Sequence, residues 1–538
     1  MATYYVRADG SSNKAGATSD AAANTSMSLA TCISESSGFA DDDVIVISDA
    51  GGVYRADWLI YGGGSSGHPI TYQANSGGTP EVRGSDLVSG FSVDSGSRYK
   101  TAAVVTTEPE QVWVDGTFGD RKASAVACVN DFDWYWAADI LYLYDSAGDP
   151  NDRSSPGIEI GQRDACMEVS QEYVDITGIT FSHSNRHGAS PYGASNMTFT
   201  DCVFEWNWIN GFTAGSTAAY SGIVIQDCVG RYNGTAAISF TASGAGSIDS
   251  CSVLRSWIYE NGKLQGDVDA DHEWTSGIKF LSPTTNCIVA ENEVYDNGIA
   301  ESGSKKGHGI WFDFAPSSSG NENEISHNLI YDNQGCAVFL EVVSYCHVFG
   351  NVAYGNNPVS GGGDWRSATI RLDTREDNDA DGIYICNNTF IGGYYGMVVT
   401  TTTTRGTGDI KNNVFKNNIV YGYSTAALYA NLGGDNDGTY GSGNVYEQNC
   451  FGAESAGFIE WDGTAYDTYD TWISASSQTD NNIESDPTFT NSGNDDYSNA
   501  AGSPSIGAGA NLGSPFNAGV LPASTWPDGV LTADRDDY

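Results

Sequence analysis

The chain has 538 residues and a formal net charge of −44, because 68 Asp and Glu residues stand against only 24 Lys and Arg residues. This charge argues against nucleic-acid binding, since the phosphate backbone would be repelled. The sequence contains no apolar run of about 18 residues, so we expect no membrane-spanning segment.

Residues 1–165 are predicted to form an N-terminal cap and the first coils of a β-solenoid. Short apolar runs at about residues 4–8, 43–47 and 70–74 have the composition of strands. The chain begins without the basic and apolar regions of a signal peptide, which favours a protein that lost its leader or leaves its cell by lysis.

Residues 166–450 are predicted to form regular coils, since one pattern repeats with steps of about 23 to 28 residues and a few longer ones. Each copy has short runs rich in Ile, Val, Phe and Thr with inside/outside alternation, which indicates strands. Two Asn landmarks recur, the first at Asn292, Asn328, Asn351, Asn388 and Asn413, and the second at Asn207, Asn233, Asn261, Asn297, Asn333 and Asn356. A strand repeat of this length predicts a parallel β-helix, in which equivalent residues stack about 4.8 Å apart.

The cysteines follow the same repeat. Six of them recur at similar places in their coils, namely Cys202, Cys228, Cys251, Cys287, Cys346 and Cys386. We interpret them as small, inward-facing packing residues, with a disulfide or metal role as the alternative. The eleven cysteines lack the closely paired spacing of a disulfide framework.

Chemistry is expected on the outside of the coils near residues 309–314 and 337–342, where alternation turns every second side chain outward. Aligning the coils by their second Asn predicts two outward files. One file reads Leu281, Asp313, Glu341, Arg371 and Thr400, and the other reads Lys279, Trp311, Phe339, Thr369 and Val398. Asp313 and Glu341 would then lie about 5 Å apart on the solvent side of the helix.

Two carboxylates at this spacing suit a retaining glycosidase, whose carboxyl groups are about 5 to 5.5 Å apart. Their mutual repulsion would raise one pKa, while Arg371 would keep its neighbour ionised. Trp311, with Phe339 beside it, would offer an apolar face on which a sugar ring stacks. The alternative interpretation is that outward Asp and Glu residues of so acidic a protein only solvate a face.

Three insertions, at residues 262–276, 299–308 and 358–366, precede the strands of this wall and are predicted to form the rim of a groove. They carry Trp274, His308 and Trp365, which we expect to contact substrate because a carbohydrate site mixes aromatic and polar side chains.

The runs at residues 4–10, 43–47 and 67–74, with the closing segments at 486–489 and 501–509, resemble right-handed parallel β-helix proteins that act on polysaccharides, including lyases, glycosidases and tail-associated depolymerases. This resemblance implies an all-β, right-handed parallel β-helix over nearly the whole chain. It also implies a small β excursion at about residues 104–156 and an irregular C-terminal closing segment at residues 451–538. The segments 309–313 and 338–342 also resemble the catalytic strands of the β-helical retaining β-xylosidases. Carried over from that family, Asp313 would be the nucleophile and Glu341 the acid/base.

Two other functions use the same wall. In a polysaccharide lyase, Lys279 or Arg371 would abstract the C5 proton of a uronic acid, with calcium or an Arg neutralising its carboxylate. In a virion tailspike, fibre or decoration protein, the wall would bind glycans without cutting them, commonly as a homotrimer. In each case the expected partner is a polysaccharide or cell-surface glycan, outside the cell or on a virion.

A partial calcium-loop pattern begins at Asp377 and continues with Asp379 and Asp381, but its twelfth position is Asn388 instead of Glu. An acidic solvated turn is the alternative interpretation of this segment. We therefore expect that no cofactor is required and that any calcium would be structural.

Overall fold

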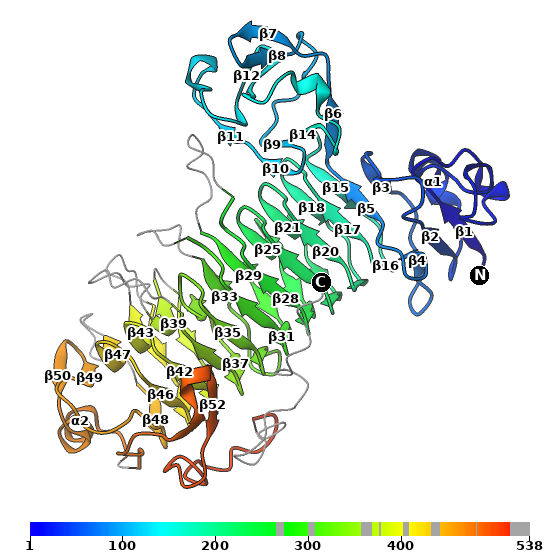
Figure 1. The fold of residues 1–538 in the computed structure, drawn as a ribbon. Helices are drawn as coiled ribbons and strands as arrows, with labels where there is room; N and C mark the ends of the chain where they lie inside the picture. The colour runs from blue at the N-terminus through cyan, green and yellow to red at the C-terminus, as the bar shows by residue number, and fades with distance from the viewer. Residues whose placement is uncertain are drawn as a thin grey trace. The chain divides into compact units, whose positions relative to one another are not determined.

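The structure is a computed structural model that describes residues 1–264, 274–299, 307–356, 368–375, 378–401, 408–431, 442–479 and 481–516. It divides into two compact units. Unit 1 comprises Met1–Gly215, Asp227–Ser239 and Asn261–Thr275, and unit 2 comprises Ser216–Gln226, Phe240–Glu260 and Ser276–Tyr538. Both units consist mainly of short strands stacked in parallel sheets (Figure 1). Within the described ranges, no helix is long and apolar enough to cross a membrane.

The coils of unit 1 contribute strands to three parallel sheets. The first sheet takes β1 (Thr3–Val6), β2 (Val44–Ile47), β4 (Ile70–Ala74), β16 (Val174–Thr177) and β19 (Met197–Thr200). The second takes β5 (Glu81–Arg83), β17 (Thr180–Ser182), β20 (Val203–Glu205) and β24 (Val229–Arg231). The third takes β3 (Trp58–Ile60), β15 (Ala165–Val169) and β18 (His187–Pro191). The helix α1 (Leu29–Glu35) begins after Ser28, whose hydroxyl accepts a hydrogen bond from the Thr31 backbone.

Unit 1 also contains two mainly antiparallel sheets with a hydrophobic core of their own. One sheet holds β6 (Ser85–Val88), β9 (Val112–Val114), β10 (Thr117–Phe118) and β14 (Ile158–Gly161). The other holds β7 (Ser92–Ser95), β8 (Arg98–Lys100), β11 (Asp120–Arg121), β12 (Asp133–Ala137) and β13 (Ile140–Tyr144). Trp134, Leu141 and Leu143 are fully buried in this core.

The coils of unit 2 contribute to the same three kinds of sheet. The first kind takes β23 (Ile223–Gln226), β27 (Ser252–Leu254), β31 (Ile288–Ala290), β34 (Asn323–Ser326), β37 (Cys346–Phe349), β41 (Tyr384–Cys386), β45 (Val414–Lys416) and β48 (Val445–Glu447). The second takes β28 (Trp257–Tyr259), β32 (Glu293–Tyr295), β35 (Leu329–Tyr331), β38 (Val352–Tyr354), β42 (Thr389–Ile391) and β46 (Ile419–Tyr421). The third takes β29 (Ser276–Leu281), β33 (His308–Asp313), β36 (Val338–Glu341), β39 (Ala368–Thr374), β43 (Tyr395–Thr401), β47 (Ala426–Asn431), β49 (Ile459–Trp461) and β50 (Thr464–Tyr466).

The remaining elements are short. Two strands contain residues of both units, β21 (Asn210–Ser216) and β25 (Ala236–Ala242). Unit 2 adds β22 (Tyr220–Ser221), β26 (Ile248–Asp249), β30 (Thr284–Thr285), β40 (Ala380–Asp381), β44 (Ile410–Lys411), β51 (Phe489–Asn491), β52 (Asp496–Asn499) and the helix α2 (Tyr469–Ser476). The prediction of an all-β parallel solenoid is therefore confirmed.

Equivalent residues stack along the core as the repeat predicts. In unit 2 the rings of Phe240, Phe280 and Phe312 stack with centroids 4.7 and 4.8 Å apart. All eleven cysteines are buried and free, which confirms that they are packing residues rather than a disulfide framework. The prediction that six of them share one place in the coils is wrong, since Cys346 pairs with Asn323, whereas Cys386 pairs with Phe349 and packs with Phe516. The core is thus a set of parallel files whose spacing is that of adjacent strands.

The asparagine landmarks form hydrogen-bonded ladders at the corners of the coils. In unit 2 the Asn328 side-chain oxygen accepts hydrogen bonds from the backbone and side-chain nitrogens of Asn292, and Asn351 does the same for Asn328. The ladder continues from Asn388 to Asn418 rather than to Asn413. The prediction for Asn413 is wrong because this coil carries an Asn at each of two corners, on either side of β45.

Candidate active site

The candidate active site lies on four consecutive parallel strands of unit 2, β29, β33, β36 and β39. Because side chains alternate along a strand, the core position of Phe312 turns Trp311 and Asp313 to the outer face. The register pairs Asp313 directly with Glu341. The two carboxylates are therefore neighbours on adjacent coils, as their sequence positions predict.

The coil that carries β39 differs from the prediction. Arg371 pairs with Phe339, and Asp373 pairs with Glu341, so the predicted register is wrong by two residues. A shift of two residues preserves the inside/outside alternation, so the sequence pattern cannot distinguish the two registers. The carboxylate file therefore continues into Asp373, and Arg371 belongs to the neighbouring aromatic file.

The aromatic part of this outer face is covered. Trp311 and Phe339 are buried in a hydrophobic cluster, and their rings stack with centroids 5.5 Å apart. Lys279 Nζ lies 3.5 Å from the centroid of the Trp311 ring, in a cation–π contact. The Trp311 ring therefore supports Lys279. Neither ring presents the free face expected for a stacking sugar, because outward rings on adjacent coils pack on each other.

The two central carboxylates are also more buried than predicted. The side chain of Glu341 is 1% exposed and that of Asp313 is 10% exposed. The expectation that both face open solvent is therefore wrong. Arg375, which contacts them, keeps 31% of its side chain exposed, so the cluster reaches the surface on the side of Arg375.

Three cations pair with three carboxylates in this cluster. The ion pairs are Lys279 Nζ with Asp313 Oδ2 at 3.1 Å, Arg371 Nη2 with Asp373 Oδ2 at 3.1 Å, and Arg375 Nη2 with Glu341 Oε1 at 2.7 Å. The same Arg375 nitrogen lies 4.0 Å from Asp313 Oδ1. The contacted oxygens of Asp313 and Glu341 are therefore at most about 7 Å apart, which is compatible with the spacing of the two carboxyl groups in glycosidases.

Sequence reasoning missed Asp373 and Arg375. Both continue the outward positions of β39 beyond Arg371, since every second residue from 371 to 375 is charged. These three alternating charges at the end of the strand could have indicated that Asp373 and Arg375 belong to the site. The pattern was missed because the insertion before this strand shifted the alignment of the coil by two residues.

Burial and neighbouring charges shift the pKa values of the ionisable side chains in this cluster. Burial, and then the charge of Asp313, raise the pKa of Glu341 to about 7, although Arg375 acts in the opposite direction. Burial raises the pKa of Asp373 against the attraction of Arg371. For Lys279, whose charged form is the protonated one, burial lowers the pKa, while the neighbouring Asp313 opposes this change. Glu341 is therefore suited to exchange a proton near neutral pH.

Several oxygens of the cluster have no hydrogen-bond partner among the described residues. They are Asp313 Oδ1, Glu341 Oε2 and Asp373 Oδ1, and all three are buried. Buried carboxylate oxygens are ordinarily hydrogen-bonded, so an unsatisfied group needs an explanation. These three oxygens can therefore accept further hydrogen bonds.

The other predicted contacts lie in different surroundings. His308 is buried against Trp311 and Phe339, and its Nδ1 accepts a hydrogen bond from the Cys336 backbone at 3.0 Å. This hydrogen bond connects the His308 side chain to the backbone of the coil that carries β36. Trp274 is 40% exposed and belongs to unit 1, whereas the wall belongs to unit 2. Trp365 lies outside the described residues, as do most positions of the three insertions.

Two of the three acidic residues of the candidate calcium segment contact a cation and an amide. Asp379 pairs with Lys411 at 2.6 Å, and Asp381 accepts a hydrogen bond from Asn412 at 3.0 Å. Asp377 lies outside the described residues. In the part of the chain that the structure describes, no group of three or more His, Cys, Asp or Glu side chains could hold a metal ion.

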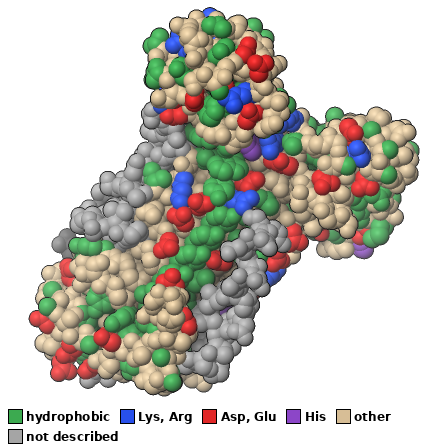
Figure 2. All heavy atoms as spheres, in the orientation of Figure 1, with side chains coloured by type: hydrophobic (Ala, Val, Ile, Leu, Met, Phe, Trp, Pro, Cys, Tyr) green, Lys and Arg blue, Asp and Glu red, His purple; other side chains and the backbone are tan. Residues whose placement is uncertain are grey.

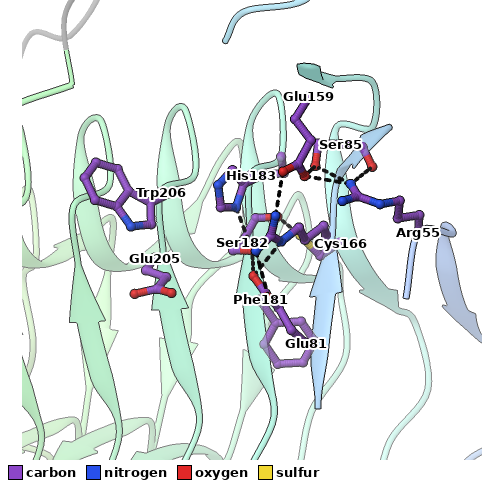
Figure 3. A network of polar contacts seen from close by, with 12 residues as sticks. Arg55, Glu81, Ser85, Glu159, Cys166, Phe181, Ser182, His183, Glu205 and Trp206 are labelled. Carbon is purple, nitrogen blue, oxygen red and sulfur yellow. Dashed lines mark hydrogen bonds and ion pairs between the residues drawn. The ribbon is translucent and has the colours of Figure 1, made fainter. Parts of the chain in front are cut away.

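A second buried cluster of charges, which the sequence did not predict, lies in unit 1 (Figure 3). Glu159 Oε1 accepts hydrogen bonds from Arg55 and Ser85, both at 2.6 Å, and its Oε2 accepts one from Arg83 at 2.6 Å. Glu81 binds the other side of Arg83 at 2.7 Å. Both oxygens of the buried Glu159 are thus satisfied by donors.

These donors reverse the effect of burial. Burial alone would raise the pKa of Glu159, but its cationic and hydrogen-bonding neighbours, led by His183 and Arg55, lower it to about 2. Burial lowers the pKa of His183 to about 4. The cluster joins β5 of the coils to β6 and β14 of the antiparallel sheet. We interpret it as a structural cluster that holds these strands together.

Comparisons with known proteins agree with this fold. Residues 165–374 match the family described as the right-handed β-helix region. No curated protein matches the sequence. Among solved structures, a complex of XylC with xylose is similar at 14% identity, with 83% of each chain covered and a TM-score of 0.57.

Two further structures are more distant. One is described as a glycoside hydrolase, with 10% identity, 84% of this chain and 96% of that chain covered, and a TM-score of 0.49. The other is pectate lyase Pel9A, with 11% identity, 96% and 93% covered, and a TM-score of 0.37. The repeat, the parallel register and the match to XylC together identify the chain as a right-handed parallel β-helix protein.

Proposed function

We propose that the protein is a retaining glycoside hydrolase acting on a neutral glycan, with Asp313 as nucleophile and Glu341 as acid/base. The observation that carries this proposal is that Glu341, whose pKa is raised to about 7, lies one coil from Asp313 and shares Arg375 with it. Adjacent strands are about 4.8 Å apart, close to the 5 to 5.5 Å between the carboxyl groups of retaining enzymes.

The reaction would proceed in two steps. Protonated Glu341 donates its proton to the glycosidic oxygen while the Asp313 carboxylate attacks the anomeric carbon, which releases the leaving sugar and forms a glycosyl ester on Asp313. Ionised Glu341 then removes a proton from water, which attacks the same carbon and frees Asp313. Lys279, 3.1 Å from Asp313, balances the carboxylate charge between turnovers.

Charge balance supports a neutral sugar. The three cations of the cluster are paired with three carboxylates, which offers a substrate carboxylate little attraction. The rest of the protein is strongly acidic, and in Figure 2 Asp and Glu side chains are more widespread than Lys and Arg on the visible face. A polyanionic substrate would therefore be repelled over most of the surface.

The similarity to XylC, solved in complex with xylose, also supports a glycan substrate. The strongly acidic composition suits a surface exposed outside the cell or on a virion, and we propose that the protein acts there on a polysaccharide or cell-surface glycan. A lyase function of Lys279 or Arg371 has less support, because each of these cations is paired with a buried carboxylate. A homotrimer remains a proposal, which sedimentation or size exclusion would test.

One observation favours a second candidate function. Glu341 is almost fully buried and Asp313 nearly so, which also suits a charge cluster inside a glycan-binding spike that cuts nothing. The two candidates differ in turnover. A binding protein would retain glycans without releasing reducing ends, whereas a hydrolase would release them.

The experiment is a panel of neutral and acidic polysaccharides, including xylan, alginate and bacterial capsules. Reducing-end release reports hydrolysis, ultraviolet absorbance reports the unsaturated product of a lyase, and proton NMR of the first product reports the anomeric configuration. We expect release with retention, abolished in Asp313→Asn and Glu341→Gln. Unsaturated products, or release that survives both substitutions, would contradict the proposal.

A further inference from the structure

Arg375 occupies a special place in the cluster, since one of its nitrogens contacts both central carboxylates. Its Nη2 lies 2.7 Å from Glu341 Oε1 and 4.0 Å from Asp313 Oδ1. Its guanidinium also lies over the ring of Phe314, 4.7 Å from the centroid. Phe314 directly follows Asp313, so the same short segment carries a carboxylate and the platform for the cation that contacts it.

The backbone at both carboxylates is unusual. Phe314, after Asp313, has φ of 47°, and Val342, after Glu341, has φ of 56°. Bulky and β-branched residues avoid this left-handed region, where strain must be held by the surrounding structure. Each turn directs the preceding carboxylate at the end of its strand, where Arg375 can contact both.

We propose that Arg375 is a positioning residue that holds the two carboxylates together and keeps Glu341 able to release its proton in each cycle. This inference rests on the proposed function for its kinetic consequence but not for its electrostatic one. The groups acting on Glu341 are Asp313 on β33 and Asp373 on β39, which favour the protonated form, and Arg375 and Lys279, which favour the ionised form. Arg375 is in direct contact with the carboxylate, whereas Lys279 is paired with Asp313.

Removing the guanidinium has a defined effect on a retaining cycle. Without Arg375, Glu341 would remain protonated to higher pH. The first step needs protonated Glu341 and would continue, whereas the second step needs it ionised and would slow. The glycosyl ester on Asp313 would therefore accumulate, which lowers kcat more than kcat/KM and produces a burst of leaving group.

The electrostatic test is an infrared titration of the Glu341 carboxyl, identified as the band that disappears in Glu341→Gln. We expect the midpoint in Arg375→Gln to rise by about one pH unit or more, and Arg375→Lys, which keeps the charge, to shift it by less than half as much. The matched control is Arg231→Gln, which breaks another Arg–Glu pair at 2.7 Å and should leave the midpoint unchanged. An unchanged midpoint in Arg375→Gln, or equal shifts in the Gln and Lys variants, would overturn the proposal.

The kinetic test uses an aryl glycoside with a good leaving group. We expect kcat of Arg375→Gln to fall about tenfold with a visible burst, while kcat/KM changes by less than about twofold. Equal losses in both constants would show that Arg375 acts in the first step and would overturn its kinetic role. If the wild-type protein turns over no glycoside, the proposed function fails, but the infrared shift still decides the role of Arg375.

Discussion

The two buried charge clusters contain the same kinds of side chain, yet they hold their central glutamates in opposite states. Glu159 in unit 1 is surrounded by donors on both oxygens, and its pKa falls to about 2. Glu341 in unit 2 has one strong partner, an unsatisfied oxygen and a neighbouring carboxylate, and its pKa rises to about 7. Burial strengthens the effect of neighbouring groups on the pKa of a carboxylate. The number of hydrogen-bond donors around a buried glutamate therefore distinguishes a structural carboxylate from a reactive one.

The largest difference is expected in catalysis. Glu341→Gln and Asp313→Asn should each lower kcat by about a thousandfold, because an amide neither transfers the proton nor attacks the anomeric carbon. Glu159→Gln should keep kcat within about twofold per folded molecule. Reducing-end assays on samples with matching circular dichroism check this. An equal loss in Glu159→Gln would remove the distinction between the clusters.

The second difference is the stability of unit 1. Glu159→Gln should destabilise the protein by about 3 kcal/mol at pH 7, since the lowered pKa means that ionised Glu159 stabilises the fold. This contribution is present above the ordinary glutamate pKa and is lost as pH falls toward 2. Urea unfolding at pH 7 and pH 3 measures it.

Two results check this interpretation. Glu205→Gln breaks the less buried pair with Arg231 and should cost less than about 1 kcal/mol. If the effect of Glu159→Gln does not shrink between pH 7 and pH 3, the lost stability comes from packing and not from charge.

In unit 2, Glu341→Gln should change the stability of the protein in the opposite direction to Glu159→Gln. Because the pKa of Glu341 is raised, its contribution to stability is present below the ordinary glutamate pKa and is lost as pH rises through about 7. Glu341→Gln should therefore stabilise the protein by about 3 kcal/mol at pH 8 and have little effect at pH 4. Thermal unfolding at both pH values checks this, and destabilisation at pH 8 would contradict it.

The smallest effect concerns a single donor of the unit 1 cluster. Ser85→Ala removes one hydrogen bond to Glu159 and should cost about 1 kcal/mol at pH 7, because two Arg partners remain. Ser250→Ala, which breaks an exposed hydrogen bond to Asp249, is the matched control and should change stability by less than about 0.5 kcal/mol. Equal effects in the two variants would show that the donor count around Glu159 matters little.

The repeat made much of the fold predictable. Strand alternation and the spacing of the asparagines indicate a parallel β-helix, and the register of Asp313 with Glu341 follows from two coils with clear landmarks. Register failed at β39, because an insertion precedes the strand and a shift of two residues leaves every side chain on the same face. It failed again at Asn413, where the neighbouring Asn418 occupies the ladder corner.

By itself the sequence determined the solenoid, the burial of the cysteines and the stacking of two carboxylates, because all three depend on local period and alternation. Only the tertiary structure decided that Trp311 is covered, that Asp373 stacks next to Glu341 on the following coil, and that Arg375 contacts both central carboxylates. The physical reason is that burial, partner count and pKa depend on side chains brought together from several coils. A local pattern in one coil carries no information about these partners.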